Sequence, residues 1–408
     1  MRQVNECRRG RVLLIFQQLD KLATARRDLI TQLNGLDRQT GELQHEYNAL
    51  HNLDAPISLL PDEILAMVFE AAKPVKEERS SHFGSLLCRI THRWRGVALA
   101  TPTLWVDIWF TQPRSFNPQA RRSLNITTSE NWRNGPSMFL SRSKWAPINI
   151  RILHFMNDDY TPEFLQLLSV HMGHCRQLHI KYGDHSGLEK VLDHVSLRPA
   201  PLLRSMTLDA DAQRIRLHGV LFPSGLPQLR TVQLHVHDAG CLRFCAPSFT
   251  LVTSLRLSFV LMISPGLAYT AFWECLTAMK SLNHLELIII DYAAESSHLP
   301  VILPNLHTLS ISSSSDRLGD IVLSIQAASL IALSITHFYP ERRLELAQIP
   351  DNKFPLLQHL IIGDAKTVIP HSNSLSFKFP HLKRITCKFF RASHSCDIEG
   401  ILTSIRPE

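Results

Sequence analysis

The residues with the clearest potential for chemistry are two histidines and two cysteines near the middle of the chain, His235, His237, Cys241 and Cys245. Imidazole nitrogen and thiolate sulfur are ligand types that zinc prefers. The two histidines, however, lie two residues apart on a predicted strand, and the two cysteines bracket a short connection where cysteine serves as a small apolar side chain. We therefore expect no metal site and no cofactor in this chain.

Local motifs for catalysis are missing from the sequence. It contains no G-x-x-x-x-G-K-[ST] phosphate loop, no G-x-S-x-G nucleophile turn and no H-E-x-x-H zinc pair. We therefore expect no catalytic residues and do not predict an enzyme. A dispersed catalytic triad stays open, because such triads are recognised by geometry and not by order in the chain.

The composition is that of an ordinary globular protein. The chain has 408 residues, of which 45% are hydrophobic and 19% charged, with a formal net charge of +7. The small basic surplus does not by itself predict a nucleic-acid partner. The eight cysteines show no paired spacing, and no apolar run reaches the length of a membrane span. These features predict reduced thiols, no membrane partner and a cytoplasmic or nuclear location.

The elements that would position these side chains are indicated by a repeated pattern, L-x-x-L-x-[LI], which recurs every 23 to 30 residues. The spacing resembles that of leucine-rich repeats, although the asparagine that such repeats often carry is missing. The last two apolar positions are two residues apart, which predicts one face of a strand. Helical patterns follow at residues 188–195 and 398–405. The nine first positions, called anchors below, are Cys175, Leu203, Leu229, Val252, Leu282, Leu306, Leu330, Leu357 and Leu382.

Basic residues follow several anchors. In a curved array they would lie on a concave face, where they could bind an acidic or phosphorylated segment of a target protein that the sequence does not name. A solvated face without a partner is the open alternative. The residues directly after anchors are Arg176, Arg204, Arg230 and Lys383, with Arg256, His284, His359 and Arg384 nearby.

Residues 57–108 combine two helical patterns with an aromatic end. Pro61 followed by two acids suits the first turn of a helix, where negative charge is favoured. Apolar residues then recur at helical spacing from Leu60 to Phe69. A second helical pattern contains Trp94 and stops at Thr101-Pro102, and a short extended segment follows at Trp105.

These three blocks resemble the F-box-like domain of fungal proteins, which carries L-P-x-E-[IL]-L, then W-R-x-[IV]-A, then T-P-x-L-W. Thr91 departs from that pattern, since the family usually has cysteine there. The resemblance implies a surface that docks on a Skp-family adaptor, together with two tryptophans that hold the helices together. The docking residues it implies are Leu59, Leu60, Pro61, Ile64, Leu65 and Phe69, and the two tryptophans are Trp94 and Trp105.

What the resemblance implies for function is a substrate-recognition adaptor subunit of a cullin-type ubiquitin ligase. The F-box would dock on the Skp-family adaptor and the cullin core, and the repeats would hold the target protein. The alternative is a protein-interaction scaffold outside such ligases, or a factor associated with nucleic acid.

The amino-terminal residues show a heptad pattern. Leucine or isoleucine recurs every seven residues from Ile15 to Leu50, and a companion row lies four residues later at Leu19, Leu33 and Tyr47. Arg26 and Thr40 interrupt the companion row, and Gly35 and Gly41 weaken the helix. The pattern predicts a coiled-coil or antiparallel helical segment. A dimerising helix and a single helix that folds back on the F-box region both stay open.

Together these patterns predict an α/β chain in four parts. They are an N-terminal heptad helix (1–56), a small all-α F-box-like domain (57–108), a linker with irregular first repeats (109–147) and a leucine-rich-repeat solenoid (148–408).

Overall fold

The computed structural model describes residues 2–53, 55–74, 83–111, 127–155, 162–182, 185–210, 219–235, 239–262, 267–292, 300–314, 318–337, 343–345, 349–363, 366–368 and 378–388. The chain divides into two compact units, Met1–Ala72 and Lys73–Glu408. None of the described helices is both long enough and apolar enough to cross a membrane.

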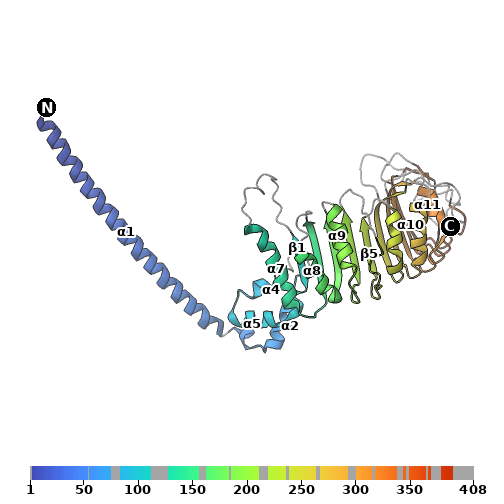
Figure 1. The fold of residues 1–408 in the computed structure, drawn as a ribbon, viewed down its shortest axis with the longest axis horizontal. Helices are drawn as coiled ribbons and strands as arrows, with labels where there is room; N and C mark the ends of the chain where they lie inside the picture. Colours follow the sequence, from blue (N-terminus) through green and yellow to red (C-terminus); the bar gives the residue numbers. More distant parts are fainter. Residues whose placement is uncertain are drawn as a thin grey trace. The chain divides into compact units, whose positions relative to one another are not determined.

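The first unit is helical. The helix α1 (Arg2–Leu53) runs for 52 residues, so the predicted amino-terminal helix is confirmed (Figure 1). The short 3-10 helix η1 (Pro56–Leu59) follows, and then the helix α2 (Asp62–Ala72). The α2 helix begins directly after Pro61, with Asp62 and Glu63 in its first turn, where their charges complement the exposed N–H groups of the helix end.

The second unit begins with short helices that lead into a strand. These are α4 (Phe83–Leu87), α5 (His92–Ala100) and the 3-10 helix η2 (Pro102–Trp105), followed by the strand β1 (Asp107–Thr111). Thr91, the residue that departs from the family pattern, caps α5, because its hydroxyl oxygen accepts the N–H of Trp94 at 3.0 Å. Threonine is therefore a good helix start at this position.

A single parallel sheet of eleven strands makes up most of the second unit (Figure 1). The strands lie side by side in chain order, each hydrogen-bonded to the next. From β4 onward each strand starts two residues after its anchor, so the repeated pattern located these strands correctly. After β1 the strands are β2 (Ile148–Phe155), β3 (Cys175–Tyr182), β4 (Ser205–Ala210), β5 (Thr231–His235), β6 (Ser254–Met262), β7 (His284–Tyr292), β9 (Thr308–Ser313), β11 (Ala332–His337), β13 (His359–Gly363) and β15 (Arg384–Lys388).

The connections between strands are unequal in kind. Among the described residues, some connections carry α-helices, and others carry 3-10 turns or short ladders such as β8 (Val301–Ile302) with β10 (Ile325–Gln326), and β12 (Arg343–Glu345) with β14 (Lys366–Val368). The helix predicted at residues 188–195 is present within α9, whereas the one predicted at 398–405 lies outside the described residues. The other helical segments are α7 (Thr127–Ser143), α8 (Pro162–His171), η4 (Met172–His174), η5 (Ala239–Phe244), η6 (Ala246–Ser248), α10 (Leu267–Ala278) and α11 (Leu318–Ser324), with α9 spanning His185–Val195.

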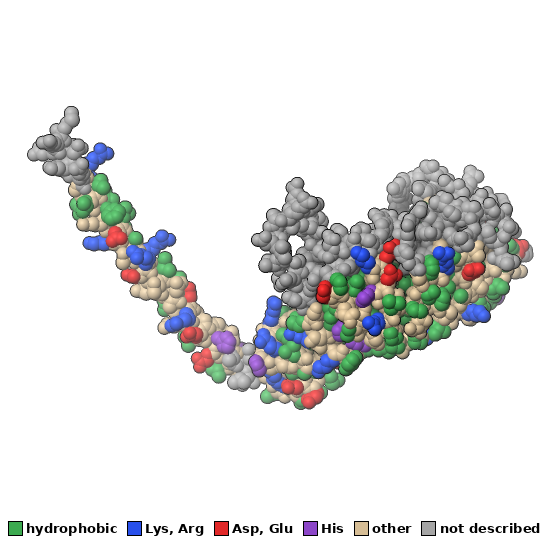
Figure 2. Space-filling view, in the orientation of Figure 1, with side chains coloured by type: hydrophobic (Ala, Val, Ile, Leu, Met, Phe, Trp, Pro, Cys, Tyr) green, Lys and Arg blue, Asp and Glu red, His purple; other side chains and the backbone are tan. Residues whose placement is uncertain are grey.

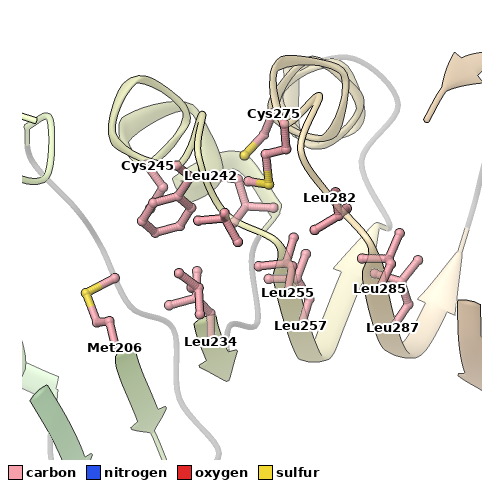
Figure 3. Packing of buried hydrophobic residues seen from close by; sticks show 14 of the residues in the cluster. Met206, Leu234, Leu242, Cys245, Leu255, Leu257, Cys275, Leu282, Leu285 and Leu287 are labelled. Carbon is pink, nitrogen blue, oxygen red and sulfur yellow. The ribbon is translucent and has the colours of Figure 1, made fainter. Parts of the chain in front are cut away.

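One apolar layer lies between the sheet and the helices. Alternate strand residues such as Leu255 and Leu257 point toward the helical segments, where they meet side chains such as Leu242 and Cys275 (Figure 3). The same buried cluster extends from Ile108 in β1 to Phe379 before β15. The predicted use of cysteine as a core residue is confirmed for Cys175, Cys245 and Cys275, which are buried and form no disulfide, and burial raises the pKa of Cys175 and of Cys275 to about 12.

The predicted fold class of a small all-α F-box followed by a leucine-rich-repeat solenoid is wrong. The structure is an α/β fold built on one large parallel sheet with helices. Its first strand, β1, begins in the last two residues of the segment predicted to be all-α and continues into the predicted linker, and it pairs with β2 from Asp107 to Thr111. The repeated pattern could not show this, because β1 and β2 precede the first anchor and the pattern marks strands without saying which sheet they join.

Candidate protein-docking surfaces

The segment that resembles an F-box leaves large apolar side chains in water. Leu59 is 80% exposed, Ile64 42%, Met67 62% and Val68 40%. Ile64, Met67 and Val68 lie three and four positions apart on α2, so they share one side of the helix. We call these four residues the docking face. Exposed apolar side chains gathered on one side of a helix, as Ile64, Met67 and Val68 are, are typical of interaction sites.

The six predicted docking residues divide between surface and interior. Leu59, Pro61 and Ile64 are exposed and Leu60 is half-buried, whereas Leu65 and Phe69 are 0% and 2% exposed. Leu65 and Phe69 can therefore support the helix but offer little area to a partner. Met67 was missed by the sequence reasoning, although its position three residues after Ile64 was a usable signal.

Trp105 is fully buried and joins three helices of the second unit. Its indole N–H donates to the carbonyl oxygen of Ala98 in α5 at 2.8 Å, and its ring meets Phe139 of α7 edge to face at 5.0 Å. The guanidinium of Arg142 lies 4.4 Å from the ring centroid. On α4, Gly84 approaches so closely that an added Cβ would come within 3.1 Å of the indole. Trp105 thus serves packing, while Trp94 is half-buried on α5.

A charged network ties the start of β1 to its surroundings. Asp107 accepts a hydrogen bond from the Asn149 side chain at 2.7 Å and lies 2.5 Å from the Lys73 ammonium, which also donates to the carbonyl of Thr103. Burial alone would raise the pKa of Asp107, but the bonds from Asn149 and Lys73 and the nearby charges outweigh it and lower this pKa. The Asp107 carboxylate is thus held by the side chains of Asn149 and Lys73, which fixes the start of β1 against its neighbours.

The face of the sheet away from the apolar layer carries polar side chains. On its first half, Asp209 accepts from Lys181 at 3.1 Å and lies 3.4 Å from His235, and Arg256 pairs with Glu286 at 3.5 Å. The later strands β9 and β11 present serine and threonine on this face. The face therefore carries both charge signs, and the predicted basic residue Arg256 is paired there with an acidic one.

The predicted basic row is contiguous at one end only. The backbone N–H of Arg204 donates to the carbonyl of Arg176 at 2.8 Å, and Arg230 donates to Arg204 at 2.9 Å, so three exposed arginines stand on neighbouring turns at the start of their strands. Lys383 belongs to the same series of backbone hydrogen bonds between successive strand starts, but five other residues of that series lie between it and Arg230. Near Lys383, Arg384 is exposed and His359 is half-buried. His284, which lies further along the sheet, is also half-buried.

No group of three or more potential metal ligands occurs among the described residues. Of the four residues with zinc-like chemistry, Cys245 is buried in the core and His235 faces Asp209, while His237 and the side chain of Cys241 lie outside the described part of the chain. His171 and His174 form a histidine pair, with ring nitrogens 3.2 Å apart. Burial lowers the pKa of both, and the charge of His174 lowers that of His171 further.

Comparison with known proteins adds no relative to these observations: the chain matches no known protein family, and no curated protein is significantly similar to it. Any assignment of function therefore depends on the chemistry and exposure of the residues themselves.

Proposed function

We propose that this chain is a substrate-recognition adaptor subunit of a cullin-type ubiquitin ligase, and that the docking face binds a Skp-family adaptor. The observation that carries the proposal is the exposure of Leu59, Ile64, Met67 and Val68 within a segment whose sequence resembles an F-box. Large apolar side chains of this kind are favoured at the centre of protein interfaces, where a few residues supply most of the binding free energy.

The second unit would hold the target protein in this proposal. Its polar sheet face and the row Arg176, Arg204 and Arg230 offer exposed hydrogen-bonding groups on a rigid sheet. Arginine pairs well with carboxylate or phosphate, so an acidic or phosphorylated target segment fits the row. The chain would supply specificity, other subunits would transfer ubiquitin, and the complex would act in the cytosol or the nucleus.

The first prediction tests the docking face with full-length protein and a purified Skp-family adaptor. The double substitution Leu59→Asp/Ile64→Asp places two charges in the proposed contact. If each residue contributes about 2 kcal/mol, the dissociation constant should rise about 30-fold per substitution, which calorimetry or surface plasmon resonance would measure.

The matched control is Leu197→Asp/Leu251→Asp, which replaces leucines of similar exposure, 70% and 43%, on the second unit. The control should bind the adaptor as the parent does. Equal binding by the parent and the docking-face variant would contradict the proposal. Salt-sensitive binding of DNA or RNA, with no adaptor binding by the parent, would support a nucleic-acid-associated factor instead.

A further inference from the structure

The helix α1 exposes far more apolar surface than a solvated helix needs. Ten large apolar residues along it are each 49% to 67% exposed, and hydrophobic side chains are visible along much of its length (Figure 2). An isolated helix in a protein is stabilised mainly by packing of its apolar face, and no described residue covers this one. The ten residues are Val12, Ile15, Leu19, Leu22, Leu29, Leu33, Leu36, Leu43, Tyr47 and Leu50.

These ten residues fall into the two core rows of a heptad repeat. Six occupy the position conventionally called d, every seventh residue from Ile15 to Leu50, and four occupy position a, namely Val12, Leu19, Leu33 and Tyr47. Arg26 and Thr40 fill the two remaining a positions. We call this set the seam. The rows stay in register for more than five heptads, which matches the period of a supercoiled helix pair.

We propose that the seam binds a second copy of this chain in a two-stranded coiled coil formed by α1. Each large aliphatic side chain can remove about 60 to 100 Å² of apolar surface from water. Twenty such residues in a pair of helices would bury about 1,200 to 2,000 Å², which is the area of a stable interface. This proposal does not depend on the proposed ligase function.

The distribution of charge along α1 favours an identical partner. Of the ten positions that flank the seam between Val12 and Leu50, only Asp37 and Glu46 are charged. A foreign helix selected by charge would be expected to face charged flanks, since those positions set partner choice. The charges gather on the outer positions instead, where Arg38 and Glu42 form an exposed ion pair at 3.8 Å. A second α1 therefore meets a complementary seam without repulsion at its edges.

Arg26 favours two strands over three or more. A charged side chain at one a position lies near the rim of a two-stranded coil, where its long stem covers apolar surface while the guanidinium stays in water. In larger coils the same position is enclosed, which a charge resists. Leucine at five of the six d positions is the pattern found in two-stranded coils.

The test measures the mass of the full-length protein by light scattering or sedimentation over a wide range of concentration. One chain has a mass of 46.4 kDa, and the parent should show twice that value. The variant Leu29→Glu/Leu36→Glu places charges in the seam and should run as a single chain. The matched control Leu13→Glu/Leu14→Glu changes leucines that are equally exposed, at 61% each, but lie off the seam, and should remain a dimer.

A further variant tests the register of the seam. Arg26→Leu should lower the dissociation constant of the dimer at least several-fold, because it fills the interrupted row with an apolar side chain. Circular dichroism should show the same helix content in the parent and in Leu13→Glu/Leu14→Glu, and less in Leu29→Glu/Leu36→Glu, because α1 of a single chain loses the packing of its apolar face. A parent of single-chain mass, a trimer or larger assembly, or a dimer that survives Leu29→Glu/Leu36→Glu would overturn the proposal. Measuring whether Leu29→Glu/Leu36→Glu binds the Skp-family adaptor tests the docking face separately from the dimer.

Discussion

At the scale of single residues, Trp105 connects three helices of the second unit, because it bonds to α5 and packs against α4 and α7. Replacing it with phenylalanine keeps most of the ring but removes the N–H that Ala98 accepts. We expect Trp105→Phe to lower the free energy of unfolding by about 1 to 2 kcal/mol. Trp105→Ala should cost about 3 to 5 kcal/mol, because it also leaves a cavity.

Urea denaturation followed by circular dichroism would measure both changes. Trp145→Phe is the matched control, since Trp145 is 86% exposed and its replacement should change stability by about 0.5 kcal/mol or less. Equal effects of the two phenylalanine variants would show that the interior contacts of Trp105 contribute little.

Neighbouring residues of the same type show what the sequence could and could not predict about the site. Ile64 and Leu65 are adjacent and both apolar, yet Ile64 is 42% exposed and Leu65 is fully buried. Helical spacing assigned both to a broad apolar surface of α2. Which of them faces water depends on how the helix packs, and that is a property of tertiary structure that one sequence does not carry.

At the scale of elements, strand positions were predictable and their surroundings were not. The strands β4 to β15 that belong to the large sheet follow their anchors, since a buried strand residue must recur with each unit. The helix α7 was not predicted, because Gly135 and Pro136 lie within it and both are poor helix formers. The strand β1 was divided between the predicted F-box-like domain and the predicted linker, because its pairing partner β2 lies some forty residues later in the chain.

Gly363 gives a prediction about strand pairing. It lies opposite Thr336 in the register of β13 with β11, and a Cβ added there would lie 2.8 Å from the Thr336 hydroxyl oxygen. We expect Gly363→Ala to destabilise the protein by about 1 to 3 kcal/mol through overpacking. In a Thr336→Ala background the same change should be neutral or slightly stabilising, because the crowding atoms are gone and alanine restricts the unfolded chain.

Thermal unfolding of the four proteins in this double-mutant cycle would measure the coupling. Gly96→Ala serves as the control, since Gly96 lies in α5 with nothing within 4 Å of an added Cβ. That change should stabilise the helix by about 1 kcal/mol. A cycle in which the effects of Gly363→Ala and Thr336→Ala simply add would show that the close approach has no energetic consequence.

At the scale of the second unit as a whole, the decisive feature is that eleven strands share one buried cluster, from Ile108 to Phe379. A parallel sheet has no local hairpins to stabilise its strands singly, so each strand depends on its neighbours and on the apolar layer above it. Leu257 in β6 is fully buried near the middle of this layer (Figure 3). Leu257→Ala should lower the free energy of unfolding by about 2 to 5 kcal/mol.

The informative measurement is hydrogen exchange at the two ends of the sheet. If the shared core couples the strands, Leu257→Ala should reduce protection at Ile150 in β2 and at Leu360 in β13 together, since global opening exposes both. Leu251→Ala, at a leucine that is 43% exposed just before β6, should leave both largely unchanged. Loss of protection in β6 and its immediate neighbours alone would mean that the ends open independently, and that continuity of the sheet does not imply cooperative stability.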